Sequence, residues 1–251
     1  MTGSLLLVPN ALDLGAQAID LQEVLPLGVI RRAAALAHWV AEDARSARAF
    51  LKRVDAVVPL ALPLQQIAVH ELPRPRKGGH APVPAAEWQA LLAPALEGHD
   101  LGLISEAGLP AVADPGAALV EAAHAAGLAV LPLAGASSLM LALAASGLNG
   151  QSFAFVGYLP QDAAARVARL HELEALSARL RQTQIVIETP YRNQALLSAL
   201  LSTLAPATRL AVSCGLTLPA GWSRSDSVAG WRAKPPPMPE RVPAVFSFLA
   251  G

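Results

Sequence analysis

The chain has 251 residues, of which 53% are hydrophobic and 15% are charged, so it can bury a sizeable core and does not belong to the class of disordered proteins. Its 19 basic and 19 acidic residues cancel, which argues against a protein coated in basic charge. A single cysteine, Cys214, excludes an internal disulfide, and no basic residues precede the first apolar run, so we expect a cytoplasmic rather than a secreted protein.

Short apolar runs rich in β-branched residues alternate with Ala- and Leu-rich stretches along the chain. This alternation is typical of strand–helix–strand units and of a mainly parallel sheet. The polar, glycine-bearing break at 147–151 is expected to separate two domains, 1–149 and 150–251. The predicted strands are 4–9, 38–43, 64–72, 100–106, 129–133, 152–159, 183–189, 209–214 and 242–249.

One long segment, 125–161, contains no Asp, Glu, Lys or Arg, so a membrane helix over 129–147 has to be considered. Pro132, Gly135 and the pair Ser137–Ser138 interrupt it, and no basic residues flank it. We therefore interpret it as a strand and a helix buried inside an α/β protein.

Charge is unevenly distributed despite the neutral total. Residues 31–80 carry nine Lys or Arg against four acids, and residues 166–251 carry ten against five. Residues 81–165 carry seven acids and no Lys or Arg. The two basic blocks fit either ordinary solvated surfaces or a rim that grips nucleic acid, and the sequence leaves both possibilities open.

Several motifs that would indicate other functions are absent. The sequence has no G-x-G-x-x-G after a strand, no P-loop, no G-x-S-x-G, no H-E-x-x-H and no paired-cysteine motif. Its six histidines show no metal-ligand spacing, so no metal is expected. Dinucleotide, nucleoside-triphosphate, serine-hydrolase and zinc-hydrolase functions therefore lose their usual support.

Two loops rich in small residues follow consecutive predicted strands. The first, 105–116, contains Gly108 and ends in Asp114–Pro115, which we expect to cap a helix and to open its first turn. The second, 132–138, contains Gly135 and two serines. Small residues where parallel strands end let a ligand approach the backbone, so the two loops predict one pocket at the sheet edge.

These stretches resemble a known family. Residues 103–116, LISEAGLPAVADPG, are similar to the S-D-A-G-x-P-x-x-x-D-P-G signature of the ribosomal RNA 2′-O-methyltransferase branch of the tetrapyrrole methylase family. Further matches follow in family order: 41–48 resembles A-E-D-T-R-x-T, 135–138 resembles P-G-A-S, 144–148 resembles S-A-S-G-L, 155–160 resembles F-x-G-F-L-P, and 188–192 resembles Y-E-S-P-H-R.

The departures from the family pattern lie around the expected pocket. Where the branch has P-T-P-I-G-N-L after its first strand, this chain has PNALDL at 9–14, without the glycine. Ala44, Glu106, Ala134 and Tyr191 replace the usual Thr, Asp, Pro and His. These changes bear on the substrate more than on the methyl donor.

The resemblance implies two α/β domains, a mainly parallel N-terminal sheet, a mixed C-terminal sheet, and S-adenosylmethionine bound in the cleft between the domains. It implies a homodimer that methylates a cytidine ribose in small-subunit ribosomal RNA. Donor contacts are expected from Pro9, Ser105, Ala107, Gly108, Ser137, Ser138, Leu159, Pro160 and Pro190.

A ribose hydroxyl is a poor nucleophile at neutral pH, so a positioned base would help. Glu42 and Asp43, at the end of a predicted strand, are the catalytic candidates, although they would also suit a helix start. The substrate-binding candidates are Arg45, Arg48, Arg74, Arg76, Lys77, Glu188 and Arg192, of which Glu188 and Arg192 can pair with each other instead.

Two other functions stay open at this point. One is methylation of a small molecule such as an acidic tetrapyrrole, which would require arginines inside the cleft. The other is a protein that binds S-adenosylmethionine without catalysis, which the altered N-terminal loop and Ala44 would favour.

Overall fold

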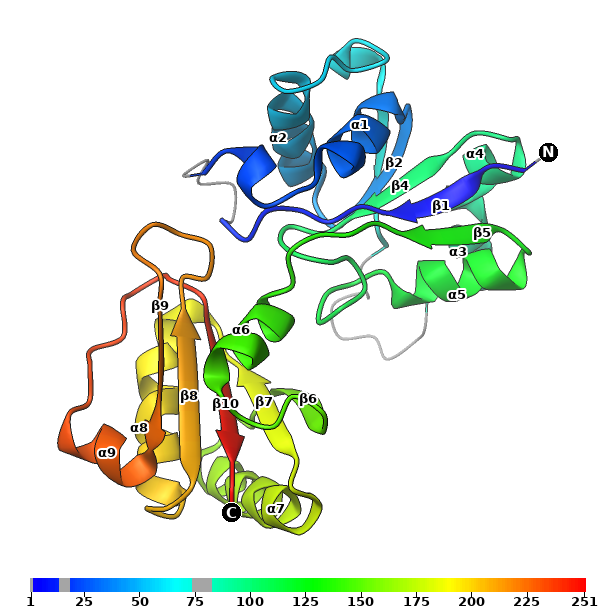
Figure 1. Cartoon of the computed structure of the whole chain (residues 1–251). Coiled ribbons are helices and arrows are strands. Elements are labelled where there is room, and N and C mark those ends of the chain that lie inside the picture. The colour runs from blue at the N-terminus through cyan, green and yellow to red at the C-terminus, as the bar shows by residue number, and fades with distance from the viewer. Residues whose placement is uncertain (1, 14–18, 74–82) are drawn as a thin grey trace. The chain divides into compact units, whose positions relative to one another are not determined.

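The computed structural model describes residues 2–13, 19–73 and 83–251. Contacts between Cα atoms divide the chain into two compact units, Met1–Ser137 and Ser138–Gly251, here called unit 1 and unit 2 (Figure 1). The division falls before helix α6 (Ser138–Ser146) rather than at the break after it. The reason is that Leu139, Ala142 and Leu143 of α6 pack against strands of unit 2.

Unit 1 contains an all-parallel sheet of five strands. They are β1 (Ser4–Leu7), β2 (His38–Ala41), β3 (Ala68–Glu71), β4 (Leu101–Ile104) and β5 (Ala129–Pro132), in the order β3-β2-β4-β1-β5. Leu5 of β1 lies opposite Leu101 of β4 and Val130 of β5. The predicted parallel N-terminal sheet is confirmed.

Helices cover both faces of the unit 1 sheet, and alternate strand residues point to opposite faces. Leu6 packs with α1 (Leu27–Ala35) and α2 (Ala44–Asp55), in a core that contains Trp39 and Phe50. Leu5 packs on the other face, toward α4 (Ala93–Leu96) and α5 (Ala117–Ala125). The remaining helical elements are η1 (Leu21–Glu23), η2 (Leu64–Gln66) and α3 (Ala85–Leu91).

Unit 2 contains a mixed sheet of five strands. They are β6 (Phe153–Tyr158), β7 (Thr183–Ile187), β8 (Arg209–Cys214), β9 (Trp222–Ser227) and β10 (Ala244–Leu249), in the order β6-β7-β10-β8-β9. Only β6 and β7 pair in parallel, and the other pairs are antiparallel. The mixed C-terminal sheet is therefore confirmed.

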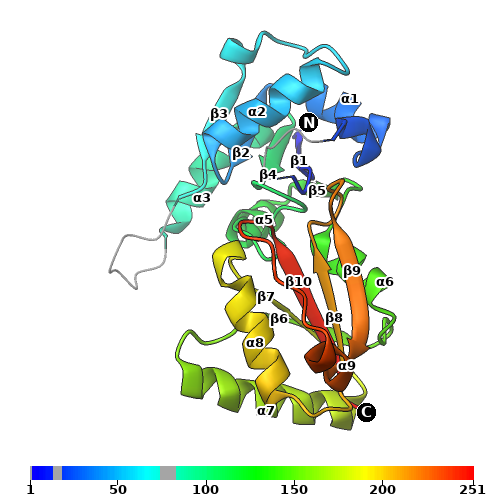
Figure 2. The ribbon, with the colours of Figure 1, turned by 90° about the vertical axis from the view of Figure 1, so that its left-hand side faces the viewer.

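The helices of unit 2 also lie on both faces of their sheet (Figure 2). One face packs on α7 (Ala163–Leu180), α8 (Asn193–Thr203) and α9 (Val228–Ala233), and the core there contains Trp231 and Phe246. The other face packs on α6. A short η3 (Pro190–Arg192) links β7 to α8.

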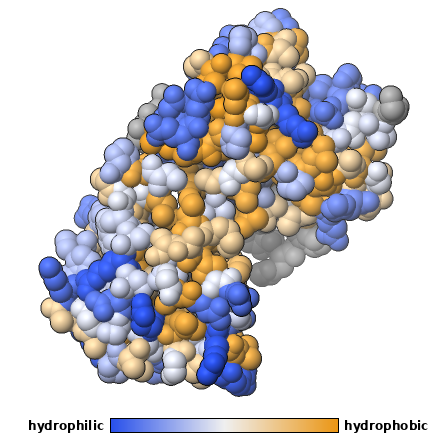
Figure 3. Space-filling model, in the orientation of Figure 1, coloured by the Kyte–Doolittle hydropathy of each residue, from blue (hydrophilic) through white to orange (hydrophobic). Residues whose placement is uncertain are grey.

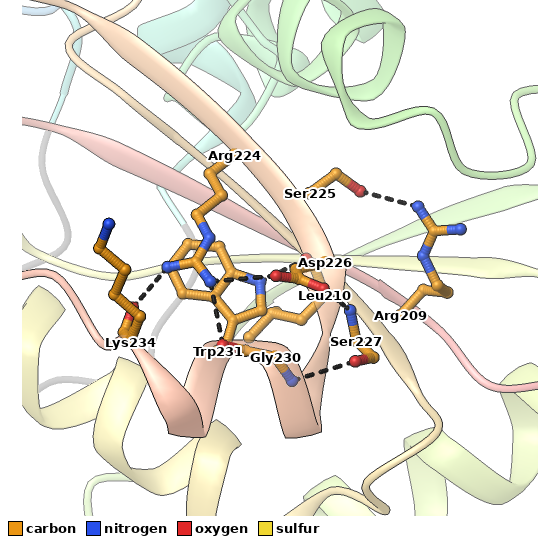
Figure 4. Close-up of polar contacts among 9 residues, drawn as sticks. All are labelled: Arg209, Leu210, Arg224, Ser225, Asp226, Ser227, Gly230, Trp231 and Lys234. Carbon is orange, nitrogen blue, oxygen red and sulfur yellow. Dashed lines mark hydrogen bonds and ion pairs between the residues drawn. The ribbon is translucent and has the colours of Figure 1, made fainter.

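Strand β9 is absent from the predicted elements, and Figure 4 shows what holds it. The guanidinium of Arg224 lies 4.2 Å from the ring centroid of Trp231, and it donates hydrogen bonds to Asp226 Oδ2 and to the carbonyl of Gly230 (Figure 4). Trp231 itself is fully buried and donates to the carbonyl of Leu210. These contacts fix α9 against β9.

The segment considered as a membrane helix forms β5 and α6, with the loop between them. Within the described residues, no helix is both long enough and apolar enough to cross a bilayer. The predicted strand 64–72 is shorter than expected, because residues 64–66 form η2 and only Ala68–Glu71 pair with β2.

Candidate functional site

Three loops of unit 1 leave the carboxyl ends of adjacent strands, β4, β1 and β5, and Asn10 ties two of them together. The backbones of Asn10 and Gly108 exchange hydrogen bonds of 2.8 and 3.2 Å. The Asn10 side-chain amide donates to the carbonyls of Ser105 at 3.2 Å and Glu106 at 3.0 Å. Asn10 is only 7% exposed, so the loop after β1 is fastened directly onto the loop after β4.

Two glycines allow these loops to approach so closely. A Cβ atom on Gly135 would lie 2.3 Å from the Cβ and Cγ atoms of Pro9, a distance that side chains do not tolerate. Gly108 has φ = +70°, in the left-handed region that favours glycine. A Cβ atom on Gly108 would also lie 3.7 Å from the carbonyl oxygen of Ala136, so the predicted pocket-forming loops after β4 and β5 meet, and the loop after β1 lies against both.

The hydroxyl of Ser105 lies beside this junction. Ser105 is 2% exposed, and its Oγ atom finds no hydrogen-bond partner within the described part of the chain. A buried polar group without a partner is destabilising, and it is commonly explained by a missing ligand or water. Among the residues predicted to contact the methyl donor, Ser105 is thus the one whose side chain most clearly has a hydrogen bond still to make.

Carboxyl groups gather at the ends of β2 and β4. Glu42 Oε2 accepts a hydrogen bond from the backbone N–H of Glu106 at 3.2 Å, and the backbone N–H of Glu42 donates to Ile104. Burial, and then the negative charges of Glu42 and Glu106, raise the pKa of Asp114 from 3.8 to about 7. A carboxyl group with a pKa near 7 can hold or release a proton at physiological pH.

The two predicted catalytic residues have different surroundings. Asp43 is the N-cap of α2, and its Oδ1 accepts a hydrogen bond of 2.7 Å from the N–H of Ser46. Glu42 instead reaches across to the loop after β4. Glu42 therefore lies closer to the predicted pocket-forming loop, whereas the cap contact of Asp43 belongs to α2.

Asp114 does not cap α5, so that prediction is wrong. The N-cap is Gly116, at φ = +131°, and the helix begins at Ala117. Ahead of it, Ala111 and Ala113 both have φ = +64°, which is unfavourable for a residue with a Cβ atom. The loop between β4 and α5 is consequently strained, a condition found often at binding sites.

Unit 2 carries a second group of residues that are predicted to contact the methyl donor. Leu159 and Pro160 follow β6, and Pro190 opens η3 after β7, so all three lie at the carboxyl edge of the only parallel strand pair of unit 2. Arg166 holds the first of these loops by donating to the carbonyl of Gln161 at 3.0 Å. Of the other predicted donor contacts, Ala107, Ser137 and Ser138 are half-buried.

Glu188 and Arg192 pair with each other, one of the two possibilities left open above. Arg192 donates to Glu188 Oε1 at 2.8 Å and to Thr189 Oγ1 at 3.1 Å. The same guanidinium lies 5.6 Å from the ring centroid of Tyr191, whose side chain is exposed.

The predicted RNA-gripping residues are only partly described. Arg45 is exposed on α2, whereas Arg48 donates to the carbonyl of Leu64 at 3.2 Å. Arg74, Arg76 and Lys77 lie outside the described residues. Within the described residues, no three His, Cys, Asp or Glu side chains are grouped to hold a metal ion.

Curated relatives carry one shared name, ribosomal RNA small subunit methyltransferase I. The Bacillus subtilis protein is 32% identical over 202 residues, which cover 76% of this chain and 62% of that protein. The Pseudomonas aeruginosa protein is 34% identical over 175 residues, which cover 69% of this chain and 54% of that protein. The chain thus spans about half the length of the curated relatives it matches, and no family model matches it.

Solved structures with the same fold cover nearly the whole chain. The methyltransferase CobJ superposes with a TM-score of 0.59 at 17% identity, over all of both chains. A uroporphyrin-III C-methyltransferase from Thermus thermophilus, complexed with S-adenosylhomocysteine, superposes with a TM-score of 0.51 at 18% identity, over 98% of this chain and 97% of that one. The resemblance drawn from the motifs is thereby confirmed: the chain is a relative of the ribosomal RNA small subunit methyltransferase I proteins and has the tetrapyrrole methylase-like fold.

Proposed function

We propose that the chain is an S-adenosylmethionine-dependent methyltransferase that methylates the 2′-hydroxyl of a cytidine ribose in small-subunit ribosomal RNA. The observation that carries the proposal is the junction of the loops after β1, β4 and β5, which gathers Pro9, Ser105, Gly108 and Gly135 at one sheet edge. The shared name of the relatives supports the substrate class.

The residues present suit such a donor. A Gly-rich strand edge lets a ligand approach the backbone, and the Ser105 hydroxyl has a hydrogen bond still to give or accept. In unit 2 the residues predicted to contact the methyl donor, Leu159, Pro160 and Pro190, are likewise apolar. We assign these residues to donor binding, as the motifs imply.

S-adenosylmethionine, when bound, supplies an electrophilic methyl group on a sulfonium. The chain's part is to orient a ribose hydroxyl in line with the methyl carbon–sulfur bond, to exclude water and to accept a proton. As the new carbon–oxygen bond forms and the carbon–sulfur bond breaks, the hydroxyl proton passes to a carboxylate. Glu42, which accepts a hydrogen bond from the backbone N–H of Glu106 and lies near Asp114, is our candidate acceptor.

A methyl-transfer assay with purified chain, labelled donor and small ribosomal subunits from a strain lacking the gene tests the proposal. We expect label in the ribosomal RNA, and mass spectrometry should locate it on one cytidine ribose. Glu42→Gln should lower kcat by about 10²- to 10⁴-fold, the usual range for loss of a general base.

The matched control is Asp43→Asn. Asparagine caps helices as well as aspartate does, so this variant should keep both fold and rate if Asp43 acts only as the cap of α2. A folded, donor-binding chain that labels neither free RNA nor subunits would refute the RNA proposal. Labelling of a tetrapyrrole instead would establish the small-molecule alternative.

We place this activity in the cytoplasm, where the enzyme would encounter its ribosomal RNA substrate.

A further inference from the structure

The only two tyrosines of the chain lie at one edge of unit 2. Tyr158 is the last residue of β6, and it pairs in register with Ile187, the last residue of the parallel neighbour β7. Tyr191 follows β7 in η3. Both aromatic rings therefore come from the carboxyl edge of the β6–β7 pair, beside the loops assigned to donor binding.

Both tyrosines are exposed to a degree that is unusual for aromatic residues. Tyr158 is 58% exposed and Tyr191 is 75% exposed. Phe153, at the opposite end of β6, is 38% exposed. Packing of the core of unit 2 does not account for the position of Tyr191, so its exposure calls for a different explanation.

The backbone that carries Tyr191 is held on both sides. Pro190 occupies the first position of η3 and has a restricted φ. Arg192 is anchored by Glu188 and Thr189, and its side chain is 29% exposed. Its guanidinium carbon lies 5.6 Å from the Tyr191 ring centroid. An exposed ring on an anchored turn, beside a guanidinium, is a preorganised stacking surface.

We propose that Tyr191, with Tyr158 at the same strand edge, stacks an unpaired nucleobase of the RNA substrate. The proposal deepens the proposed function and rests on it. Base recognition in RNA commonly uses aromatic faces and guanidinium planes, and every base offers a flat face to such a platform. An enzyme that methylates a ribose must also hold the nucleotide in a fixed position, which stacking of a base would provide.

Binding by base stacking depends on salt differently from binding by charged contacts to phosphates. Contacts to phosphates release counterions, so they determine the salt dependence of binding, whereas stacking does not. Loss of the Tyr191 ring should therefore weaken RNA binding at every salt concentration by the same factor. The chemical identity of the stacked base should matter little.

Equilibrium binding of a fluorescent single-stranded oligoribonucleotide to the full chain tests this. Tyr191→Ala should weaken binding by about 5- to 150-fold, the range for loss of one base–aromatic stack. Tyr191→Phe keeps the ring and should bind as the wild type does. Phe153→Ala, at the other end of β6, is the matched control and should also leave binding unchanged.

Two further ligands identify what is stacked. An oligonucleotide of the same length with abasic sugars should bind the wild type and Tyr191→Ala equally well. S-adenosylhomocysteine should bind both with the same affinity. Equal loss of S-adenosylhomocysteine and RNA binding in Tyr191→Ala would show that the ring stacks the adenine of the donor, and would overturn the proposal.

Failure of this proposal differs from failure of the proposed function. If wild type and Tyr191→Ala bind RNA equally and both methylate it, the stacking proposal alone is wrong. If the wild type neither binds nor methylates RNA, the proposed function is wrong and the stacking proposal falls with it. A change in salt slope with Tyr191→Ala would indicate a charge effect and contradict stacking.

Discussion

At the residue scale, one side chain fastens two loops of the predicted pocket together. In the loop after β1, where this chain departs from the family pattern, Asn10 reaches to the carbonyls of Ser105 and Glu106. This contact could not be predicted from the sequence, because Asn10 and Ser105 are 95 positions apart and meet only once β1 pairs with β4. One of the departures from the family pattern thus holds together the loops of the predicted pocket.

Asn10→Asp should damage this junction. The change replaces an N–H donor by a carboxylate that faces two carbonyl oxygens, so we expect a loss of stability of about 1–3 kcal/mol. Donor affinity, measured by calorimetry, should fall by about tenfold, equivalent to about 1.4 kcal/mol.

Asn149→Asp is the matched control for Asn10→Asp. The amide of Asn149 also donates to a backbone carbonyl, that of Arg181, but it lies in unit 2, on a turn without predicted donor contacts. It should lose stability and keep donor affinity. If both variants bind the donor normally, Asn10 has only a structural role.

Asp114 gives the chain a pH dependence. Below pH 3.8 its carboxyl is protonated whether the chain is folded or not, whereas between pH 3.8 and about 7 it ionises only in the unfolded chain. The free energy of unfolding therefore falls as pH rises through this window, and the penalty is complete above pH 7. Asp114→Asn should raise the Tm more at pH 8 than at pH 4, as measured by thermal melts.

Asp226→Asn should change the Tm in the opposite direction to Asp114→Asn and lower it at pH 8. Its hydrogen bond from Arg224 lowers the pKa of Asp226, so the ionised form stabilises the fold at pH 8 and this contribution is lost only as pH falls through that lowered pKa. A Tm difference for Asp114→Asn that is the same at both pH values would show that its carboxyl does not titrate between them.

At the element scale, the apolar strands could be predicted and the polar one could not. Residues 209–214 and 244–249 are apolar runs, and both are strands within a residue or two of the expected bounds. Strand β9 has the sequence WSRSDS, and polar residues at a sheet edge carry no alternating apolar pattern. Its position is determined by six paired residues of β8, a contact between segments that single-sequence periodicity does not report.

The helix start at α5 was misplaced for a related reason. Asp–Pro is a strong local signal for a cap, but here Asp114 lies instead in the carboxyl cluster, where burial and the charges of Glu42 and Glu106 raise its pKa. The turn that reaches the helix then passes through Ala111 and Ala113 at positive φ, and Gly116 completes it. Long-range packing overrides the local preference.

Ala113→Gly should relieve part of the strain in that loop. Left-handed backbone costs an alanine about 1–2 kcal/mol, and glycine adds about 0.5–1 kcal/mol of unfolded-chain entropy, so a net gain of about 0.5–1 kcal/mol is expected. Denaturant unfolding measures it. Ala118→Gly, exposed within α5, is the control and should lose about 0.5–1 kcal/mol. A loss in both variants would mean that Ala113 is not strained.

At the scale of the whole molecule, apolar side chains reach the surface of both units (Figure 3). Helix α6 is apolar on nearly all sides: Leu139 and Leu143 are buried, while Met140 and Leu141 are 45% and 38% exposed. Phe155 of β6, next to Ile185 beneath α6, is also exposed. A helix with this composition is normally covered, which agrees with the homodimer that the family resemblance implies.

Light scattering tests the assembly. We expect a particle of twice the 26.0 kDa chain mass at micromolar concentration. The double variant Met140→Glu and Leu141→Glu should shift the mass to that of one chain. Leu180→Glu, on an equally exposed leucine at the end of α7, should leave it unchanged. A wild-type particle of 26.0 kDa would contradict the dimer.

The place of β10 has a consequence for synthesis. Among the strands of unit 2 it is made last, yet it lies in the middle of the sheet, between β7 and β8. While the chain emerges from a ribosome, β6–β7 and β8–β9 can each form a two-stranded piece, but such pieces are marginal in water and expose unpaired edges. Unit 2 therefore cannot close its sheet until residues 244–249 are free, and a chain that stalls shortly before them would depend on chaperones rather than fold early.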